Sequence, residues 1–287
     1  MKTILVPTDF SPQAENAIDL AIQIAKRAKD VKITILHVIE SETGVAFIDT
    51  ADAGYVNMEH QLFMAQYLEK REKKLKDDMF SLAAQDRFVG LEVGTDIEVG
   101  NPFQNISKAI ANHQADLLIM GTQGASGMEE VLIGSNTEKV VRNAHCPVIT
   151  LKQHLKLDDI KDIVVATNLK DDHSLMIVEL QKLQQFTGAK LHFLKVNTPN
   201  HFHTDRYVKG EFAKFEEKYQ LSNYSVNIYN DATEEDGVIY FAEDIGASMI
   251  ALGTHGRTGL MHLLSGSIAE DLVNHAKIPV WTLSLKK

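Results

Sequence analysis

Gly121-Thr-Gln-Gly124 is followed, after nine residues, by Gly134-Ser135, and about 132 positions later the chain repeats this pattern as Gly253-Thr-His-Gly256 and Gly266-Ser267. Each copy comes directly after an apolar run, at 117–120 or 249–252. A strand that leads through a glycine-rich loop into a helix is typical of a phosphate site, because backbone N–H groups at the helix end can approach the anion. The two copies predict a duplicated fold with a phosphate cradle in each half.

The similarity between the halves extends beyond the glycines. Residues 115–151 aligned without gaps on 247–283 are identical at about 15 of 37 positions, which is the mark of an internal repeat. The chain therefore divides into two domains, 1–153 and 158–287, each of ordinary domain size. The boundary falls in a polar stretch near 152–159.

Short β-rich runs alternate with helical patterns in both halves. Strands are expected at 2–7, 31–38, 89–98, 115–121, 146–151, 162–167, 189–196, 224–229, 247–253 and 279–285. Helices are expected at 12–28, 57–84, 102–113, 135–144, 173–186, 205–220, 236–245 and 267–276. Continuous apolar strands alternating with helices predict, in each half, a doubly wound α/β domain with a parallel sheet covered on both faces.

The halves differ mainly at 40–84, where the first half carries an insertion. Residues 40–57 have the composition of a loop, and the following stretch predicts a long charged helix. The apolar line of that helix is Met64, Leu68, Leu75, Met79 and Leu82. A longer helix that covers the sheet is favoured over a dedicated partner site.

The composition limits the classes of function. A net charge of −10 argues against nucleic acid and anionic membrane as general partners, although it permits a small anion held by local backbone dipoles. The single cysteine, Cys146, excludes an internal disulfide framework, and its apolar context predicts a buried side chain. The N-terminal run is too short for a signal sequence, and no apolar run approaches the roughly 18–20 residues of a membrane span. These features favour the cytoplasm.

The glycine loops differ from other nucleotide-binding and catalytic motifs. A P-loop requires a lysine directly after its last glycine, and neither motif of this chain has one. The first strand ends in Pro7-Thr8-Asp9 rather than in the G-x-G-x-x-G of dinucleotide-binding folds, and no G-x-S-x-G nucleophile elbow is present.

The helices after both loops open with the pattern Ser-x-x-Glu, at Ser135 with Glu138 and at Ser267 with Glu270. This pattern predicts two capping boxes, in which the serine oxygen accepts from a backbone N–H. The same hydroxyl could still donate to a phosphate oxygen, so the capping and binding roles are compatible.

Asp9 stands at the end of the first strand, where open α/β sheets bind ligands. We expect Asp9, Val38 and Gly121 to converge on one crevice. There Asp9 could accept from a ribose hydroxyl or an adenine amine, or hold a metal through water. Capping of the first helix together with Ser11 is an equally good role for Asp9.

One histidine-rich run is a candidate metal site. His201-Phe-His203-Thr-Asp205 is a weak signal, and a solvated polar loop is the favoured interpretation. No Ser/His/Asp set or carboxylate pair is strong enough to indicate catalysis. We therefore expect no catalytic residue and no metal held by the protein itself.

Both halves resemble domains of the universal stress protein family, and the chain is similar to a tandem member over essentially its whole length. The resemblance is carried by residues 253–267, by the opening 4–9, and by Pro147-Val148 and Pro279-Val280. It implies a five-stranded parallel sheet in each half, with the halves packed as a pseudo-dimer through their last strands, which would cover exposed edges. A homodimer and an unidentified protein partner are compatible with it.

The resemblance also implies binding of an adenine nucleotide, ATP, with Mg²⁺ held only through the nucleotide. In the first half the implied contacts are Pro7, Thr8, Asp9, Val38, Gly121, Gly124, Gly134, Ser135 and Asn136. In the second half they are Asn168, Val196, Gly253, Gly256, Arg257, Gly266, Ser267 and Ile268. Asp9 and Val38 would face adenosine, while the glycines and the Gly-Ser turn would hold the phosphates.

The two halves depart unequally from the family pattern. Asn168 stands where the family has the aspartate seen at Asp9, and Ala166 stands in place of Pro7. Asparagine can still form hydrogen bonds but lacks the charge. The first half, with its adenosine side intact, is therefore slightly favoured for nucleotide, whereas Arg257 argues for the second half as an extra phosphate contact.

Three functions follow as alternatives. The first is a cytoplasmic stress-response protein that binds ATP for regulation, with slow hydrolysis at most. The second is an adenine-nucleotide hydrolase or transferase, which the absence of an activating group near the phosphates disfavours. The third is a nucleotide-free interaction module, which two complete glycine patterns disfavour. Turnover assays and nucleotide binding distinguish the three.

Overall fold

The computed structural model describes residues 1–40, 58–122, 134–169, 173–254 and 266–285. The first half contains β1 (Thr3–Pro7), α1 (Pro12–Arg27), β2 (Lys32–Ile39), α2 (Met58–Ala83), β3 (Glu92–Val99), α3 (Pro102–Asn112), β4 (Leu117–Gly121), α4 (Ser135–Asn143) and β5 (Val148–Leu151). The second half contains β6 (Asp162–Ala166), α5 (Ser174–Thr187), β7 (Lys190–Asn197), α6 (Asp205–Tyr219), β8 (Tyr224–Asn230), α7 (Glu234–Asp244), β9 (Met249–Thr254), α8 (Gly266–His275) and β10 (Val280–Ser284). Every predicted strand and helix is present, with ends that shift by at most three residues.

The described strands form one ten-stranded sheet in the order β3-β2-β1-β4-β5-β10-β9-β6-β7-β8. Within each half all pairings are parallel, as predicted for a doubly wound α/β domain. In both halves the strand order reverses between the first and fourth strands of that half. The carboxyl ends of β1 with β4, and of β6 with β9, therefore mark the two crevices where such sheets bind ligands.

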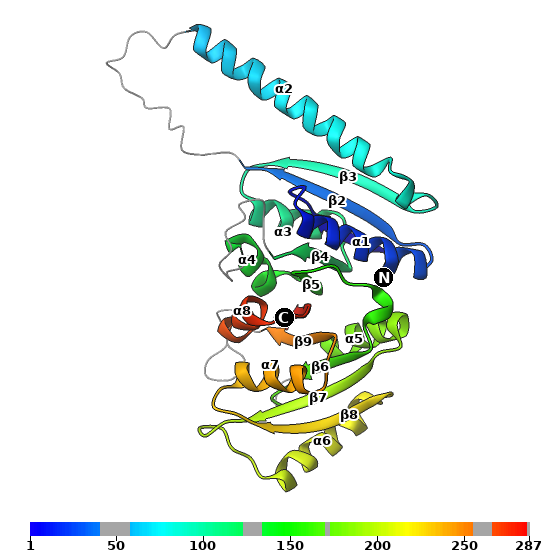
Figure 1. Cartoon of the computed structure of the whole chain (residues 1–287), viewed down its shortest axis with the longest axis vertical. Helices are drawn as coiled ribbons and strands as arrows, with labels where there is room; N and C mark the ends of the chain where they lie inside the picture. The colour runs from blue at the N-terminus through cyan, green and yellow to red at the C-terminus, as the bar shows by residue number, and fades with distance from the viewer. Residues whose placement is uncertain (41–57, 123–133, 170–172, 255–265, 286–287) are drawn as a thin grey trace, which may run out of the picture.

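The halves meet through their last strands, as predicted. β5 and β10 pair antiparallel, with Trp281 opposite Ile149, and the Thr150 hydroxyl donates to the Val280 carbonyl at 3.2 Å. Trp281 is almost fully buried at this junction. Each edge strand thus closes the other, and the two five-stranded sheets become one continuous surface (Figure 1).

Alternate residues along the strands point into two separate hydrophobic cores. Ile4 and Val6 of β1 lie in the core formed with α1, α2, α5 and α6. Leu5 lies in the core formed with α3, α4, α7 and α8. Each core contains residues of both halves, so the two hydrophobic layers continue across the junction of β5 and β10.

The insertion contains α2. The C-terminal end of this helix lies beside β3, and the rest of the helix extends past the edge of the sheet (Figure 1). Met79 and Leu82 are buried against the core, and Leu75 is half-buried. The side chains of Met64 and Leu68, the other members of the predicted apolar line, lie outside the described residues. Only the C-terminal part of the helix is therefore shown to cover the sheet.

Candidate functional site

The two crevices begin with the same backbone turn. After β1, the Phe10 N–H donates to the Thr8 hydroxyl oxygen at 3.0 Å, and after β6 the Leu169 N–H donates to Thr167 in the same way at 3.0 Å. Phe10 and Leu169 both adopt the left-handed conformation, with φ of 63° and 62°. A strained conformation repeated at two non-glycine residues shows that the duplication preserved the geometry of the strand ends.

In the first half, Asp9 lies within this turn, between Thr8 and Phe10, and is exposed. Its Oδ1 accepts from the Ser11 N–H at 3.0 Å, and the Ser11 hydroxyl caps α1 by accepting from the Ala14 N–H at 3.2 Å. Asp9 therefore takes part in the helix start, as the capping alternative predicted. Val38, at the end of the neighbouring β2, is half-buried.

The first glycine of each motif has a packing role. A Cβ on Gly121 would lie 2.7 Å from Gln13 Cβ and 2.9 Å from the Gln13 carbonyl carbon, so glycine lets α1 approach the end of β4. A Cβ on Gly253 would lie 2.6 Å from Leu285 Cδ1. The Gln13 backbone of α1 cannot move without shifting the helix, which explains glycine at Gly121 without any ligand, whereas the contact at Gly253 is with the end of a side chain, which can turn aside.

Gly134 is different from these two glycines. It is the N-cap of α4 with φ of −59°, which other residues adopt readily, and no atom of the described residues lies within 4 Å of a Cβ built there. Its N–H donates to the Thr122 carbonyl at 3.1 Å, which places the start of α4 beside the end of β4. Neither the backbone conformation nor packing against the described residues accounts for glycine here.

The expectation of a capping box at Ser135 is wrong. Ser135 is the first residue inside α4, Gly134 holds the cap position, and no side chain caps the helix. The Ser135 side chain is exposed, and Asn136 is half-buried. Because a capping side chain must come from the residue before the helix, the one-residue offset leaves the Ser135 hydroxyl clear of that role.

The residues of the two predicted phosphate cradles are only partly covered by the structure. Gly266 and Ser267 open α8, and Gly124, Gly256 and Arg257 lie outside the described residues. Ile268 is buried in the core under α8, at the position where the first half has the half-buried Asn136. The structure thus assigns Ile268 to packing.

The residues predicted to contact adenosine are less exposed in the second crevice than in the first. Asn168 and Val196 are 9% and 5% exposed, whereas their counterparts Asp9 and Val38 are exposed and half-buried. A cavity of about 20 Å³, close to the volume of one water, remains there. Its lining is Ala166, Thr167, Asn168, Leu194, Lys195, Val196, Glu234 and Val238.

Lys195 and Glu234 are the site residues that sequence reasoning missed. The Lys195 side chain is buried, at 4% residue exposure, and the Glu234 side chain is 14% exposed. Burial raises the pKa of the Glu234 carboxyl, while the charges of Lys195 and His201 act in the opposite direction. An unusual buried charge was visible in the sequence only as a lysine within an apolar strand.

The histidine-rich run does not gather a metal site within the described residues. His203 stacks on Tyr207 with ring centroids 4.6 Å apart, and its N–H donates to Asn197 Oδ1 at 3.2 Å. His201 Nδ1 lies 3.8 Å from Glu234 Oε1. Asp205 is the first residue of α6 and is exposed.

Asp162, His192 and Ser225 form a hydrogen-bonded row in the second half that the sequence did not indicate. His192 Nε2 lies 2.7 Å from Asp162 Oδ1, and its Nδ1 lies 2.9 Å from the Ser225 hydroxyl. The Asn227 amide also donates to the Ser225 oxygen at 3.2 Å. These hydrogen bonds join β6, β7 and β8 near their amino ends, opposite the crevices, and so tie the edge strand β8 to the two strands beside it.

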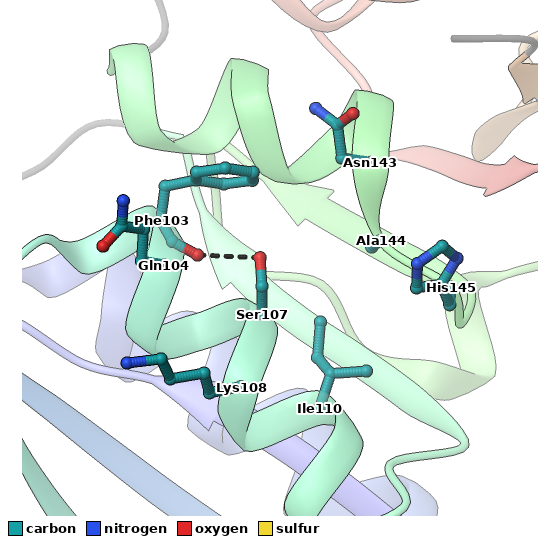
Figure 2. Close-up of a pocket in the computed structure, with 8 residues that line it drawn as sticks. All are labelled: Phe103, Gln104, Ser107, Lys108, Ile110, Asn143, Ala144 and His145. Atoms are coloured by element: carbon teal, nitrogen blue, oxygen red, sulfur yellow. Dashed lines mark hydrogen bonds between the residues drawn. The ribbon is translucent and has the colours of Figure 1, made fainter.

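A larger cavity of about 390 Å³ lies between α3 and the C-terminal end of α4 (Figure 2). It is lined by Phe103, Gln104, Ser107, Lys108, Ile110, Asn143, Ala144 and His145. None of these is a predicted nucleotide contact. In the described part of the chain, no helix is long and apolar enough to cross a membrane.

Comparison with known proteins connects this duplicated site to one family. The sequence model of the universal stress protein family matches residues 1–152 and again residues 159–284. A Staphylococcus aureus strain USA300 protein named after this family is 30% identical over 174 residues, which cover 60% of this chain and 96% of that protein. A solved universal stress protein from Archaeoglobus fulgidus has a TM-score of 0.71 at 22% identity and covers 99% of both chains. Another from Pseudomonas aeruginosa UCBPP-PA14 has a TM-score of 0.62 at 16% identity, covering 99% of this chain and 93% of that one.

Proposed function

The chain belongs to the universal stress protein family, and from that premise we propose that it is a cytoplasmic stress-response protein that binds ATP–Mg²⁺ in its first half. ATP serves regulation rather than metabolism, with slow hydrolysis at most. The phosphates would lie at the start of α4, and adenosine would lie at the carboxyl ends of β1 and β2.

Gly134 is the observation that supports this proposal most strongly. With a φ of −59° and no atom of the described part of the chain within 4 Å of a Cβ, this position does not require glycine for its conformation or for packing against those residues. A glycine at a helix start lets phosphate oxygens come close to the backbone donors of the first turn. The exposed Ser135 hydroxyl, which does not cap the helix, supplies one more donor at the same place.

The adenosine side of the first crevice has matching chemistry. Asp9 is exposed, and a carboxylate can accept several hydrogen bonds, so the bond from the Ser11 N–H does not exhaust it. A ribose hydroxyl is a donor of the kind it would accept. Val38 offers a half-buried apolar surface on which a base can pack.

The position of α4, between the proposed phosphate site and the second half, supports a regulatory role. The helix begins at the proposed phosphate site, and its Arg142 contacts Glu270 of α8 in the other half. A nucleotide that favours one position of α4 would therefore change the balance between conformations of the whole chain. Mg²⁺ would be held by the phosphates and would neutralise part of their charge.

Calorimetric titration with ATP–Mg²⁺ tests the proposal on the wild-type chain and on Gly134→Glu. The new carboxylate would repel phosphate and fill the space it needs, so affinity should fall at least tenfold, or about 1.4 kcal/mol. Gly210→Glu is the matched control, because Gly210 is exposed on α6 with no atom within 4 Å of a Cβ. No heat of binding for the wild type, or equal binding by both variants, contradicts the proposal. A phosphate-release assay in parallel measures turnover.

A further inference from the structure

The two crevices can be compared position by position. The Thr8 N–H donates to the Leu36 carbonyl at 2.8 Å, and the Thr167 N–H donates to the Leu194 carbonyl at 3.0 Å. These equivalent bonds align β2 with β7, so that His37 corresponds to Lys195 and Val38 to Val196. In the same way Pro102 and Glu234 are the first residues of α3 and α7, each after an N-cap whose side chain accepts from the helix.

We propose that the second crevice is closed to nucleotide by the chain's own side chains, with Lys195 and Glu234 as the determinants, so that each chain binds one ATP. The inference rests on the proposed function and adds the number of sites and the residues that decide it. The second unit of the repeat then serves as a structural partner for the first.

The first argument is the close approach of α7 to β7. A Cβ on Gly237, the fourth residue of α7, would lie 2.5 Å from Val196 Cγ1 and 3.1 Å from Asp231 Cβ. The helix therefore packs directly on the residue that corresponds to the adenosine contact. In the first half the fourth residue of α3 is Asn105, whose buried side chain donates to the Val99 carbonyl at 3.2 Å. A full side chain fits there, and Val38 remains partly accessible.

The second argument is the pair of charged side chains in the cavity. Lys195 and Glu234 both line the small cavity of the second crevice, next to Asn168 and Val196. Glu234 Oε1 accepts no hydrogen bond among the described residues, and Lys195 exerts an electrostatic attraction on the carboxylate. A nucleotide entering here would have to displace both side chains, and separating opposite charges in a buried site is costly.

The third argument is the change from Asp9 to Asn168. The exposed carboxylate of the first crevice becomes an amide with 9% exposure. Thr167, beside it, is as buried as Thr8 in the first half, and its hydroxyl lies 3.1 Å from His173 Nε2, a contact within the protein. The carboxylate that would receive a ribose in the first half is therefore replaced in the second by an amide that the protein encloses.

Equilibrium dialysis with labelled ATP–Mg²⁺ at saturation counts the sites. We expect one ATP per chain in the wild type and none in Gly134→Glu, with Gly210→Glu unchanged at one. A variant that restores the residues of the first half, Lys195→His with Glu234→Pro, should gain a second, weaker site. Proline suits the first position of α7, where no N–H is needed, and circular dichroism verifies that the variant is folded.

The outcomes separate the two proposals. Two ATP per chain in the wild type, falling to one in Gly134→Glu, would overturn the closed second crevice and leave ATP binding intact. No bound ATP in the wild type would overturn the proposed function itself. A count that stays at one in the folded double variant would overturn the assignment of closure to Lys195 and Glu234.

Discussion

The Arg142 guanidinium of α4 contacts the Glu270 carboxylate of α8, and this ion pair joins the two halves of the repeat. Glu138, the counterpart of Glu270 within the first half, lies 3.8 Å from the same guanidinium. One arginine therefore serves two equivalent carboxylates, because the second half has Asn274 where the first has Arg142. The pair lies between the helices that follow the two glycine motifs.

Removing this arginine should destabilise the chain. Arg142→Met leaves two partly buried carboxylates without their cation, and we expect a loss of about 1–3 kcal/mol in the free energy of unfolding. Urea unfolding measures it. Arg27→Met, which breaks the exposed pair with Asp158, is the control and should cost less than about 1 kcal/mol. Equal losses in both variants would show that the junction does not depend on Arg142.

The two glycines of the first motif should respond differently to a methyl group. Gly121→Ala forces a Cβ to within 2.7 Å of Gln13 and should cost about 1–3 kcal/mol of stability. Gly134→Ala places the methyl group in open space and should leave the free energy of unfolding nearly unchanged while weakening ATP binding. Urea unfolding and calorimetric titration of both variants test this. A stable Gly121→Ala variant would contradict the assigned packing role.

The raised pKa of Glu234, caused first by burial, predicts a pH-dependent stability. The folded state holds the proton more tightly than the unfolded chain, so this contribution is fully present below the ordinary glutamate pKa of about 4.3 and is lost as pH rises through the raised value. Glu234→Gln stays neutral, so its stability relative to wild type should increase with pH across that window.

Urea unfolding between about pH 4 and 8 measures this difference. Glu243→Gln, on the same helix with a half-exposed side chain, is the matched control and should follow the wild-type curve. Parallel curves for Glu234→Gln and the wild type would show that burial of this carboxyl has no energetic consequence.

Cys146 should be unreactive in the folded chain. It is buried in the bend between α4 and β5, and burial raises the pKa of its thiol to about 12. Because the thiolate is the reactive form, modification by Ellman's reagent at pH 8 should be negligible until guanidinium unfolds the protein. One thiol per chain should then react. Rapid labelling without denaturant would contradict the buried position.

The sequence was sufficient to predict the repeat and the strand and helix positions, because apolar periodicity is local and the duplication repeats it. The pairing of β5 with β10 was expected from the family resemblance. The closure of the second crevice was not predictable, because it depends on contacts between residues distant in sequence, Lys195 with Glu234 and Val196 with Gly237, and on how closely α7 packs. The Ser-x-x-Glu pattern predicts Ser135 as the N-cap, whereas Ser135 is the first residue of α4. The pattern alone does not distinguish these two positions.

Hydrogen–deuterium exchange with and without saturating ATP–Mg²⁺ tests the central claim most directly, because it locates the nucleotide. Amides at 8–11, 36–39 and 134–138 should exchange more slowly with nucleotide, while those at 166–169 and 194–197 should be unchanged. Protection confined to the second set, or no protection anywhere in the chain, would contradict a nucleotide site in the first half.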